Sequence, residues 1–237
     1  MKMSVHWPKI LLFGDSITQL SFEPGGWGAS IANQVQRKCD VVNRGFSGYN
    51  SRWARIILPS VFPPEMVRDA VAVTLFLGAN DSCLEEVWPS QYVSLEAYTD
   101  NMKAMIKYFE SKGLPKERLM LITPPPIDEA AWSEACKTKG TTLNRTLKNS
   151  GKYAKACCDL AQDLGVKVID LWTLMQKEEN WGPRFLCDGL HLTLEGAGFL
   201  YKHLSGFVDD CTASLPQQWP DWSDIDYANP EKSFQQD

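Results

Sequence analysis

Short apolar runs alternate along the chain with longer stretches in which apolar residues recur at helical spacing. The runs span residues 10–13, 40–43, 70–77, 118–123 and 166–171 and are rich in β-branched side chains. Nearly continuous apolar runs of this length are typical of strands that are covered on both faces. The pattern therefore predicts five strands of a parallel sheet.

Between these runs, apolar residues recur every three or four positions, which predicts amphipathic helices. The apolar stripes lie at residues 27–35, 98–109, 143–164 and 200–211. Alternation of strands and helices is typical of a parallel sheet with helices on both faces and right-handed crossovers. We therefore expect an α/β fold, a three-layer α/β/α sandwich with strand order 2-1-3-4-5.

Two segments interrupt the alternation. Three consecutive prolines at 124–126 end the fourth strand, because proline supports neither a helix interior nor a sheet ladder, and they open an insertion that runs to about Gly140. The segment after Pro216 is acidic and rich in tryptophan. We divide the chain into a domain of residues 1–215 and a tail of residues 216–237, which packs on the body or on a partner chain.

Composition narrows the class of protein further. The chain has 237 residues, is 44% hydrophobic and carries a formal net charge of −5, which suits one large globular domain and gives no nucleic-acid-binding surface. No apolar run approaches the length of a membrane span, and residues 1–13 lack a signal-peptide core. The seven cysteines form no Cys-x-x-Cys pair, so reduced thiols and a cytoplasmic location are expected. A homodimer is compatible with the sequence but does not follow from it.

Ser16 stands directly after the first expected strand. In an open parallel α/β sheet, the carboxyl ends of the strands form the ligand-binding edge. A serine hydroxyl there can act as a nucleophile if a base takes its proton. The alternative is a turn serine or a helix N-cap, but the next helical stripe begins only near Trp27.

His191 is the best candidate for that base. It lies in the loop after the fifth strand, and imidazole titrates near neutrality. Asp188 is placed to accept the other ring N–H and to fix the tautomer. Of the remaining histidines, His6 precedes the first strand and His203 falls in the last helical stripe. The alternative makes Asp188 a turn residue and His191 a cap of the last helix.

Donors for a developing oxyanion are the second requirement of acyl transfer. The candidates are the backbone N–H of Ser16, the backbone N–H of Gly45 and the side-chain amide of Asn80, which follow the first three strands. Glycine admits a close approach of substrate, and an asparagine amide donates at any pH. The alternative is that Gly45 and Asn80 only form turns.

Bulky apolar residues near these motifs are candidates for binding an apolar group of the substrate. They are Trp27, Phe46, Tyr49, Leu84 and Leu190. The alternative for each of them is packing in the core or in a loop.

Other catalytic signatures are missing. The nucleophile elbow Gly-x-Ser-x-Gly is absent, and Ser47 fails its spacing. No phosphate loop, complete dinucleotide fingerprint or metal-ligand spacing is present, so we expect no cofactor and no metal.

The motif blocks occur at residues 13–18, 44–54, 76–81 and 188–191. Their order and spacing resemble the GDSL/SGNH hydrolase superfamily over about residues 10–205, and the longer matches resemble the isoamyl acetate-hydrolysing esterase family. The resemblance implies a flavodoxin-like fold and cofactor-free hydrolysis of small carboxylic esters, with short acetate-type esters preferred. It also implies that Ser16, Asp188 and His191 are the catalytic residues and that Gly45 and Asn80 complete the oxyanion hole.

Other functions remain open within and beyond this resemblance. A lysophospholipase, a thioesterase or a sugar deacetylase would share the same motifs. A binding protein that keeps the fold without catalysis is a different class, although every chemical role in the motif set is filled.

Overall fold

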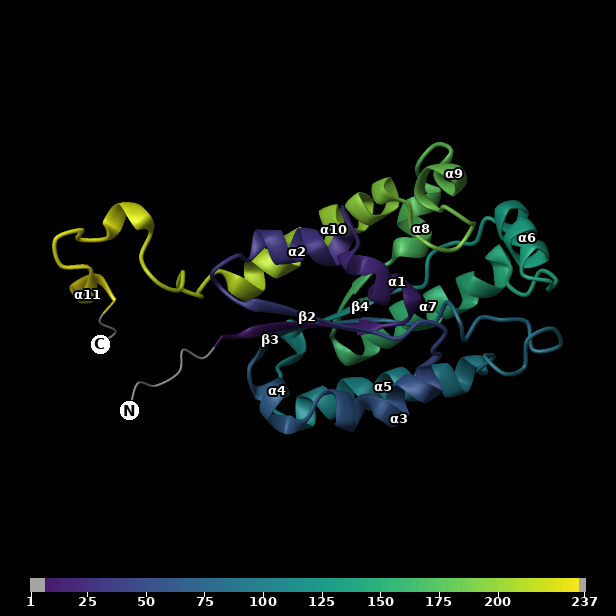
Figure 1. The fold of residues 1–237 in the computed structure, drawn as a ribbon. Coiled ribbons are helices and arrows are strands. Elements are labelled where there is room, and N and C mark those ends of the chain that lie inside the picture. Colours follow the sequence, from purple (N-terminus) through teal and green to yellow (C-terminus); the bar gives the residue numbers. More distant parts are fainter. Residues whose placement is uncertain (1–6, 235–237) are drawn as a thin grey trace.

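A computed structural model of the chain describes residues 7–234. Its centre is a five-stranded parallel sheet in the order β2-β1-β3-β4-β5, which confirms the predicted order (Figure 1). Each expected run forms a strand with nearly the expected bounds. The strands are β1 Lys9–Gly14, β2 Asp40–Gly45, β3 Ala70–Phe76, β4 Leu119–Ile122 and β5 Lys167–Ile169.

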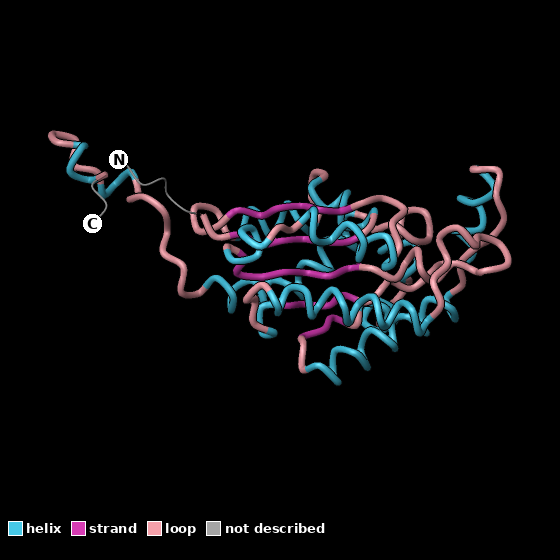
Figure 2. The backbone as a smooth tube through the Cα atoms, turned by 90° about the horizontal axis from the view of Figure 1, so that it is seen from below, coloured by secondary structure: helices cyan, strands magenta, loops and turns pink. Residues whose placement is uncertain are grey.

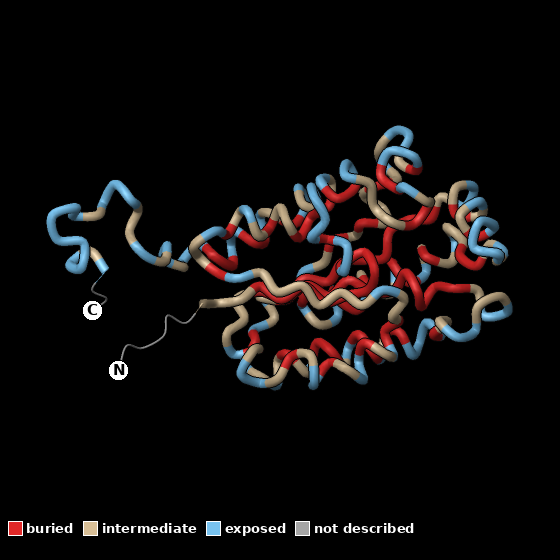
Figure 3. The backbone as a smooth tube through the Cα atoms, in the orientation of Figure 1, coloured by how far each residue is buried: buried red, intermediate tan, exposed pale blue. Residues whose placement is uncertain are grey.

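Two helical layers cover the sheet, which confirms the three-layer α/β/α architecture (Figure 1). Side chains alternate between the faces of a strand, so Ile10 and Leu12 of β1 enter one core, whereas Leu11 and Phe13 enter the other. The first core contains residues of α2 Trp27–Gln34, α6 Glu129–Thr138, α8 Leu171–Gln176, α9 Trp181–Phe185 and α10 Leu194–Thr212. The second contains residues of α3 Ser51–Val61, α4 Pro64–Arg68, α5 Leu95–Ser111 and α7 Leu147–Leu164. Figure 3 shows the buried strands between these layers.

The predicted stripes correspond to α2, α5, α7 and α10, whereas α1 Ser16–Gln19, α3, α4, α6, α8 and α9 were not predicted. Two of these six bear on the motif region. The short helix α1 begins at Ser16 itself, far ahead of Trp27, because the Asp15 side chain caps it by accepting the N–H of Ile17 at 3.0 Å. Helix α6 forms inside the insertion that follows the three prolines, where Asp128 caps its first turn. The prolines themselves remain outside helix and sheet.

The register of the sheet gathers the motif loops at one edge. Gly14 at the end of β1 pairs with Gly45 of β2 and with Phe76 of β3, and Phe76 pairs with Ile122 of β4. The segments that follow these strands therefore start side by side, and Figure 2 shows loops gathered beyond the ends of the strands. No helix within residues 7–234 is long and apolar enough to cross a membrane.

The tail leaves the body after α10 and contains short turns, η3 Trp222–Asp224 and α11 Pro230–Ser233. Arg37 anchors its start by donating to the carbonyl oxygens of Trp219 and Pro220, each at 2.8 Å. Because Arg37 precedes β2, this anchor lies at the edge of the sheet opposite the motif loops. Trp222 and Tyr227 are 76% and 84% exposed. The division at residue 215 and a partner chain for the tail stay predictions, as does the cytoplasmic location.

Candidate active site

Three polar side chains from distant parts of the chain form one hydrogen-bonded series. Ser16 Oγ lies 2.9 Å from Nε2 of His191, and Nδ1 of the same ring lies 2.8 Å from Oδ2 of Asp188. Ser16 comes from the start of α1, and the other two residues come from the loop between α9 and α10. A hydroxyl joined to an imidazole that is joined to a carboxylate is the arrangement that activates a serine.

Asp188 has two hydrogen-bonding roles. Oδ1 accepts the backbone N–H groups of Leu190 and His191 at 3.0 and 2.8 Å, which shapes the loop, while Oδ2 is left for the ring. Burial alone would raise the pKa of this carboxyl, but the hydrogen bonds from His191 and the positive charge of its ring lower the pKa to about 2. Asp188 is thus both the turn residue and the partner of the ring.

The capping alternatives for Ser16 and His191 do not hold in this structure. Asp15 rather than Ser16 caps α1, and Thr193 rather than His191 caps α10 by accepting the N–H of Gly196 at 3.0 Å. His203 is exposed and rests against the Phe199 ring, with the ring centres 4.7 Å apart. His6 lies outside the described residues.

Ser16 and His191 open into a hollow of about 280 Å³ that is lined mainly by polar residues. It contains Ser16, Ser47, Gly48, Asn80, Trp88, Gln91, Trp132, Cys136, Lys139, Thr141, Asn144, Arg145, Leu190 and His191. The amide nitrogen of Asn80 donates to the Tyr49 carbonyl oxygen at 2.9 Å, so one of its two hydrogens is left for the hollow. Asn80 therefore lines the same hollow as Ser16 with one amide hydrogen still available.

Gly45, in contrast, is not brought to the hollow. Its N–H donates to Oδ1 of Asn43 at 2.9 Å, and a Cβ at this position would overlap the backbone of Gln19. This glycine serves the close packing of α1 on β2 rather than a substrate. The expectation that Gly45 supplies an oxyanion donor is therefore corrected by the structure.

Gly48 lines the hollow instead. Its φ of 80° lies in the left-handed region and lets the chain turn back, so that Tyr49 N–H reaches the carbonyl oxygen of Phe46 at 3.1 Å. Within residues 7–234, the backbone N–H groups of Ser16 and Gly48 donate to no protein acceptor. Both remain available to a ligand in the hollow.

The expected substrate-binding residues divide into three groups. Leu190 lines the hollow. Trp27 lines a second, smaller hollow of about 120 Å³, which shares His191 with the first. Phe46, Tyr49 and Leu84 line neither hollow; Phe46 and Tyr49 pack against each other with ring centres 5.2 Å apart. Phe46 and Tyr49 therefore pack against each other rather than line a hollow, which is the alternative that the sequence left open for them.

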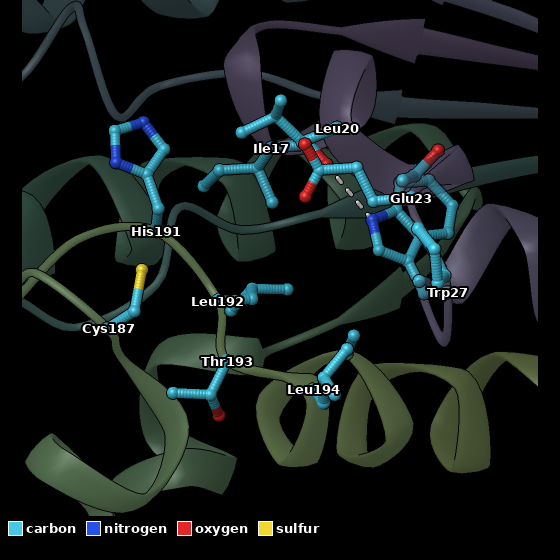
Figure 4. A pocket seen from close by; sticks show the side chains of 13 residues that line it. Ile17, Leu20, Glu23, Trp27, Cys187, His191, Leu192, Thr193 and Leu194 are labelled. Atoms are coloured by element: carbon cyan, nitrogen blue, oxygen red, sulfur yellow. Dashed lines mark hydrogen bonds between the residues drawn. The ribbon is translucent and has the colours of Figure 1, made fainter.

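The second hollow is mainly apolar. Figure 4 shows Ile17, Leu192 and Leu194 around it, with His191 at one end and Trp27 at the other. The indole N–H of Trp27 donates to the carbonyl oxygen of Ile17 at 3.1 Å, which leaves the carbon atoms of the indole to line the cavity. Both hollows therefore reach the imidazole; more polar side chains line the larger one, and more apolar side chains line the smaller one.

Arg145 and Gln91 are site residues that pattern reasoning missed. Arg145 occurs in an Asn-Arg-Thr tripeptide that resembles a glycosylation acceptor, yet both Asn144 and Arg145 are buried at the wall of the hollow. Nothing in the local sequence distinguishes this arginine from a surface one. Within residues 7–234, no cluster of three His, Cys, Asp or Glu side chains is arranged to hold a metal ion.

Comparison with known proteins assigns the family. The model of the GDSL-like lipase/acylhydrolase family matches residues 12–198. The chain belongs to that family. The isoamyl acetate-hydrolyzing esterase 1 homolog of Rattus norvegicus is 51% identical over 232 residues, which are 98% of this chain and 93% of the rat protein. Its Homo sapiens counterpart is 51% identical over 229 residues, 96% and 92% of the two chains. The expected resemblance is confirmed, and as a GDSL acylhydrolase the protein is a carboxylic ester hydrolase.

Solved structures with the same fold agree with this architecture. The lipase/acylhydrolase from Enterococcus faecalis superposes with a TM-score of 0.68 at 21% identity, covering 90% of this chain and all of the other. The acetyl xylan esterase AlAXEase gives 0.63 at 18% identity, covering 84% of this chain and 98% of the other. At such identities the likeness concerns the fold.

Proposed function

We propose that this GDSL hydrolase cleaves short, apolar carboxylic esters through an acyl-enzyme on Ser16. The observation that carries the proposal is the pair of distances at His191, 2.9 Å to the Ser16 hydroxyl and 2.8 Å to the Asp188 carboxylate. A neutral imidazole held in this way accepts a proton at Nε2 and keeps its own proton at Nδ1.

In the first step, Ser16 Oγ attacks the ester carbonyl carbon while its proton passes to Nε2 of His191. The negative charge on the carbonyl oxygen is met by the N–H groups of Ser16 and Gly48 and by the amide of Asn80. Collapse of this intermediate breaks the bond to the alcohol oxygen, which takes the proton from the imidazolium.

In the second step, water replaces the alcohol. His191 takes a proton from this water, whose oxygen attacks the acyl carbon, and the imidazolium then returns the proton to Ser16 Oγ as the acid leaves. Asp188 stays ionised throughout, which its pKa of about 2 supports at every pH of interest.

The size and lining of the two hollows support a short apolar substrate. The proposed oxyanion donors line the larger hollow, and the smaller hollow beside Trp27 and Leu194 offers room for one apolar arm of the ester. The rat and human relatives are named for hydrolysis of isoamyl acetate, an ester of a short acid and a short branched alcohol.

A hydrolysis screen of purified protein tests this proposal. The panel contains 4-nitrophenyl esters from acetate to decanoate, acetate esters of alcohols from ethanol to octanol, an acetylated sugar and an acyl thioester. We expect the highest kcat/KM for short esters and no turnover by Ser16→Ala. A fluorophosphonate probe should label the wild-type protein and not Ser16→Ala. Wild-type turnover by Ser16→Ala, or no hydrolysis of any panel member by labelled wild-type protein, contradicts the proposal.

The apolar hollow has its own test. Leu194 is 68% exposed, lines the hollow and is the first residue of α10 after its cap. Leu194→Ala should widen the hollow and shift the preference toward longer chains. The shift should appear in the 4-nitrophenyl ester series if the acyl chain lies in this hollow, and in the acetate ester series if the alcohol lies there. Leu95→Ala is the matched control, because Leu95 also follows a capping residue, at the start of α5, and lines neither hollow. An unchanged preference in Leu194→Ala removes the apolar hollow from the binding site.

A further inference from the structure

A buried guanidinium lies directly behind two of the three proposed oxyanion donors. Arg145 is 4% exposed, and its Nη2 donates to Oδ1 of Asn80 at 2.8 Å and to Oε1 of Gln91 at 3.0 Å. Gln91 in turn donates from Nε2 to the carbonyl oxygen of Gly48 at 2.7 Å. Nη2 of Arg145 is thus linked directly to Asn80, which is the side-chain donor, and through Gln91 to the turn that carries the backbone N–H of Gly48.

We propose that Arg145 is the positioning residue of the oxyanion hole, and this inference rests on the proposed function. It holds the Asn80 amide and the Gly48 turn so that their N–H groups point at the reacting carbonyl oxygen. It does so through the neighbouring side chains and without a bond to the substrate.

The two ends of the Asn80 amide face different partners. Oδ1 faces the guanidinium of Arg145, and Nδ2 faces the Tyr49 carbonyl oxygen and the hollow. Reversing the amide would place an NH₂ group against a guanidinium, which accepts no hydrogen bond, and an oxygen against a carbonyl oxygen. Arg145 therefore decides that the end facing the hollow is the donor.

A second amide, that of Gln91, connects Arg145 to the Gly48 turn. Gln91 accepts from Arg145 with one end of its amide and donates to the Gly48 carbonyl oxygen with the other. The same orientation rule fixes this amide, because its oxygen must face the guanidinium. Gln91 thereby holds the Gly48–Tyr49 peptide, which adjoins the peptide that carries the Gly48 N–H.

Arg145 itself is held on every side. Nε donates to the carbonyl oxygen of Ala79 and Nη1 donates to Oδ1 of Asn144, each at 2.8 Å, and the guanidinium lies 5.2 Å from the centre of the Trp132 ring. Within residues 7–234, no carboxylate pairs with it at ion-pair distance. A buried cation without a paired anion is costly in the resting protein. The positive charge of Arg145 becomes favourable when negative charge develops on the carbonyl oxygen of the substrate, on the other side of the Asn80 amide.

A lysine at position 145 cannot make these hydrogen bonds. The planar guanidinium presents several N–H groups in fixed directions, whereas an ammonium is a compact charge on a flexible stem. Arg145→Lys should therefore keep the charge and lose the orientation of Asn80 and Gln91. Loss of a whole oxyanion donor costs about 10²–10³ in kcat, and we expect loss of its orientation to lower kcat by about 10–10² with KM changed less than threefold.

The matched control is Arg55→Lys. Arg55 also donates to an asparagine oxygen, Oδ1 of Asn101 at 3.2 Å, but it lies on α3 and lines neither hollow. Its kcat should stay within twofold of the wild type. Thermal unfolding of each variant is measured alongside, so that a fall in kcat is compared at equal folded fraction.

Two readouts separate positioning from a merely structural role. In Arg145→Ala, added guanidinium ion should restore part of kcat in a saturable manner, whereas ammonium at the same ionic strength should not. In an Asn80→Ala background, the further effect of Arg145→Lys should shrink to a few-fold, because the donor that it positions is already gone. Equal effects of Arg145→Lys with and without Asn80 overturn the inference.

Gln91→Glu keeps the test decisive if the arginine variants do not fold. A glutamate at this position can pair with Arg145 but has no donor for the Gly48 carbonyl oxygen, and it neutralises the charge behind Asn80. We expect kcat to fall at least fivefold with KM little changed, and an unchanged kcat overturns the inference. If Ser16→Ala abolishes turnover while Arg145→Lys and Gln91→Glu both retain it, the positioning role fails and the proposed function stands. If Ser16→Ala retains turnover, the proposed function itself fails.

Discussion

Replacing Asp188 by asparagine isolates one hydrogen bond of the proposed catalytic machinery. The introduced asparagine would keep an oxygen for the backbone N–H groups of Leu190 and His191, which Oδ1 of Asp188 now accepts at 3.0 and 2.8 Å. Its NH₂ group would then face Nδ1 of the imidazole. That nitrogen would have to become the acceptor, which moves the ring proton to Nε2, where it points at Ser16 Oγ. Such an imidazole cannot take the serine proton.

The structure sets the size of this effect. If Asp188 only orients the ring, we take its contribution from the net shift of its pKa from 3.8 to about 2, which is roughly 2.5 kcal/mol or just under 10²-fold in rate. If Asp188 also fixes the tautomer, the asparagine can support catalysis only after its amide flips and turns its oxygen toward Nδ1. The flip leaves the backbone N–H groups of Leu190 and His191 without an acceptor, at a cost of about 1–3 kcal/mol each. Adding this to the roughly 2.5 kcal/mol gives about 4.5–8.5 kcal/mol, so kcat should fall by at least about 10³. The equivalent change in serine proteases lowers kcat by about 10⁴.

The assay is kcat for 4-nitrophenyl acetate between pH 6 and 9, with thermal unfolding measured on the same samples. Asp170→Asn is the matched control, since Asp170 also accepts a backbone N–H, from Thr173 at 3.0 Å, but caps α8 away from the hollow. Its kcat should stay within twofold of the wild type. A fall of less than tenfold in folded Asp188→Asn would refute the tautomer argument and leave Asp188 as a turn residue.

Two further predictions concern glycine and a buried carboxyl. Gly45→Ala should unfold at a much lower urea concentration than the wild type, because the added Cβ overlaps the Gln19 backbone. Gly48→Ala should stay folded and lose kcat, because Gly48 carries a proposed oxyanion donor. If urea titrations and kinetics gave the reverse pattern, Gly45 would be the donor. Burial raises the pKa of Asp81 to about 7, although both of its oxygens accept the N–H of Ser51. The folded protein therefore holds this proton more tightly than the unfolded chain, so stability from it is present at low pH and is lost as the pH rises toward 7. The free energy of unfolding of Asp81→Asn, relative to wild type, should rise by more than about 1 kcal/mol between pH 5 and 8, and a pH-independent difference would contradict the raised pKa.

The sequence by itself determined the architecture and the order of the motifs. Apolar runs with strand length, alternating with helical stripes, are local patterns, and local patterns report which residues face a core. They predicted the bounds of the strands closely and, through the position of each motif at a strand end, the side of the sheet where Ser16, Asn80 and His191 meet. Helix α6 in the proline insertion was not predicted, because its apolar stripe is short.

Only the tertiary structure decided which donors face the hollow. Gly45 and Gly48 stand three residues apart in one motif, and nothing local separates them. The Asn43 side chain occupies the N–H of Gly45, while Gln91, 43 residues further along the chain, fastens the Gly48 turn. Arg145 likewise looks like an ordinary polar residue until the fold buries it behind Asn80. The direction of a backbone or amide donor depends on how the packed chain orients its partners, whether they are two residues away, as Asn43 is, or far along the chain, as Gln91 and Arg145 are, so it is not a property of the pattern.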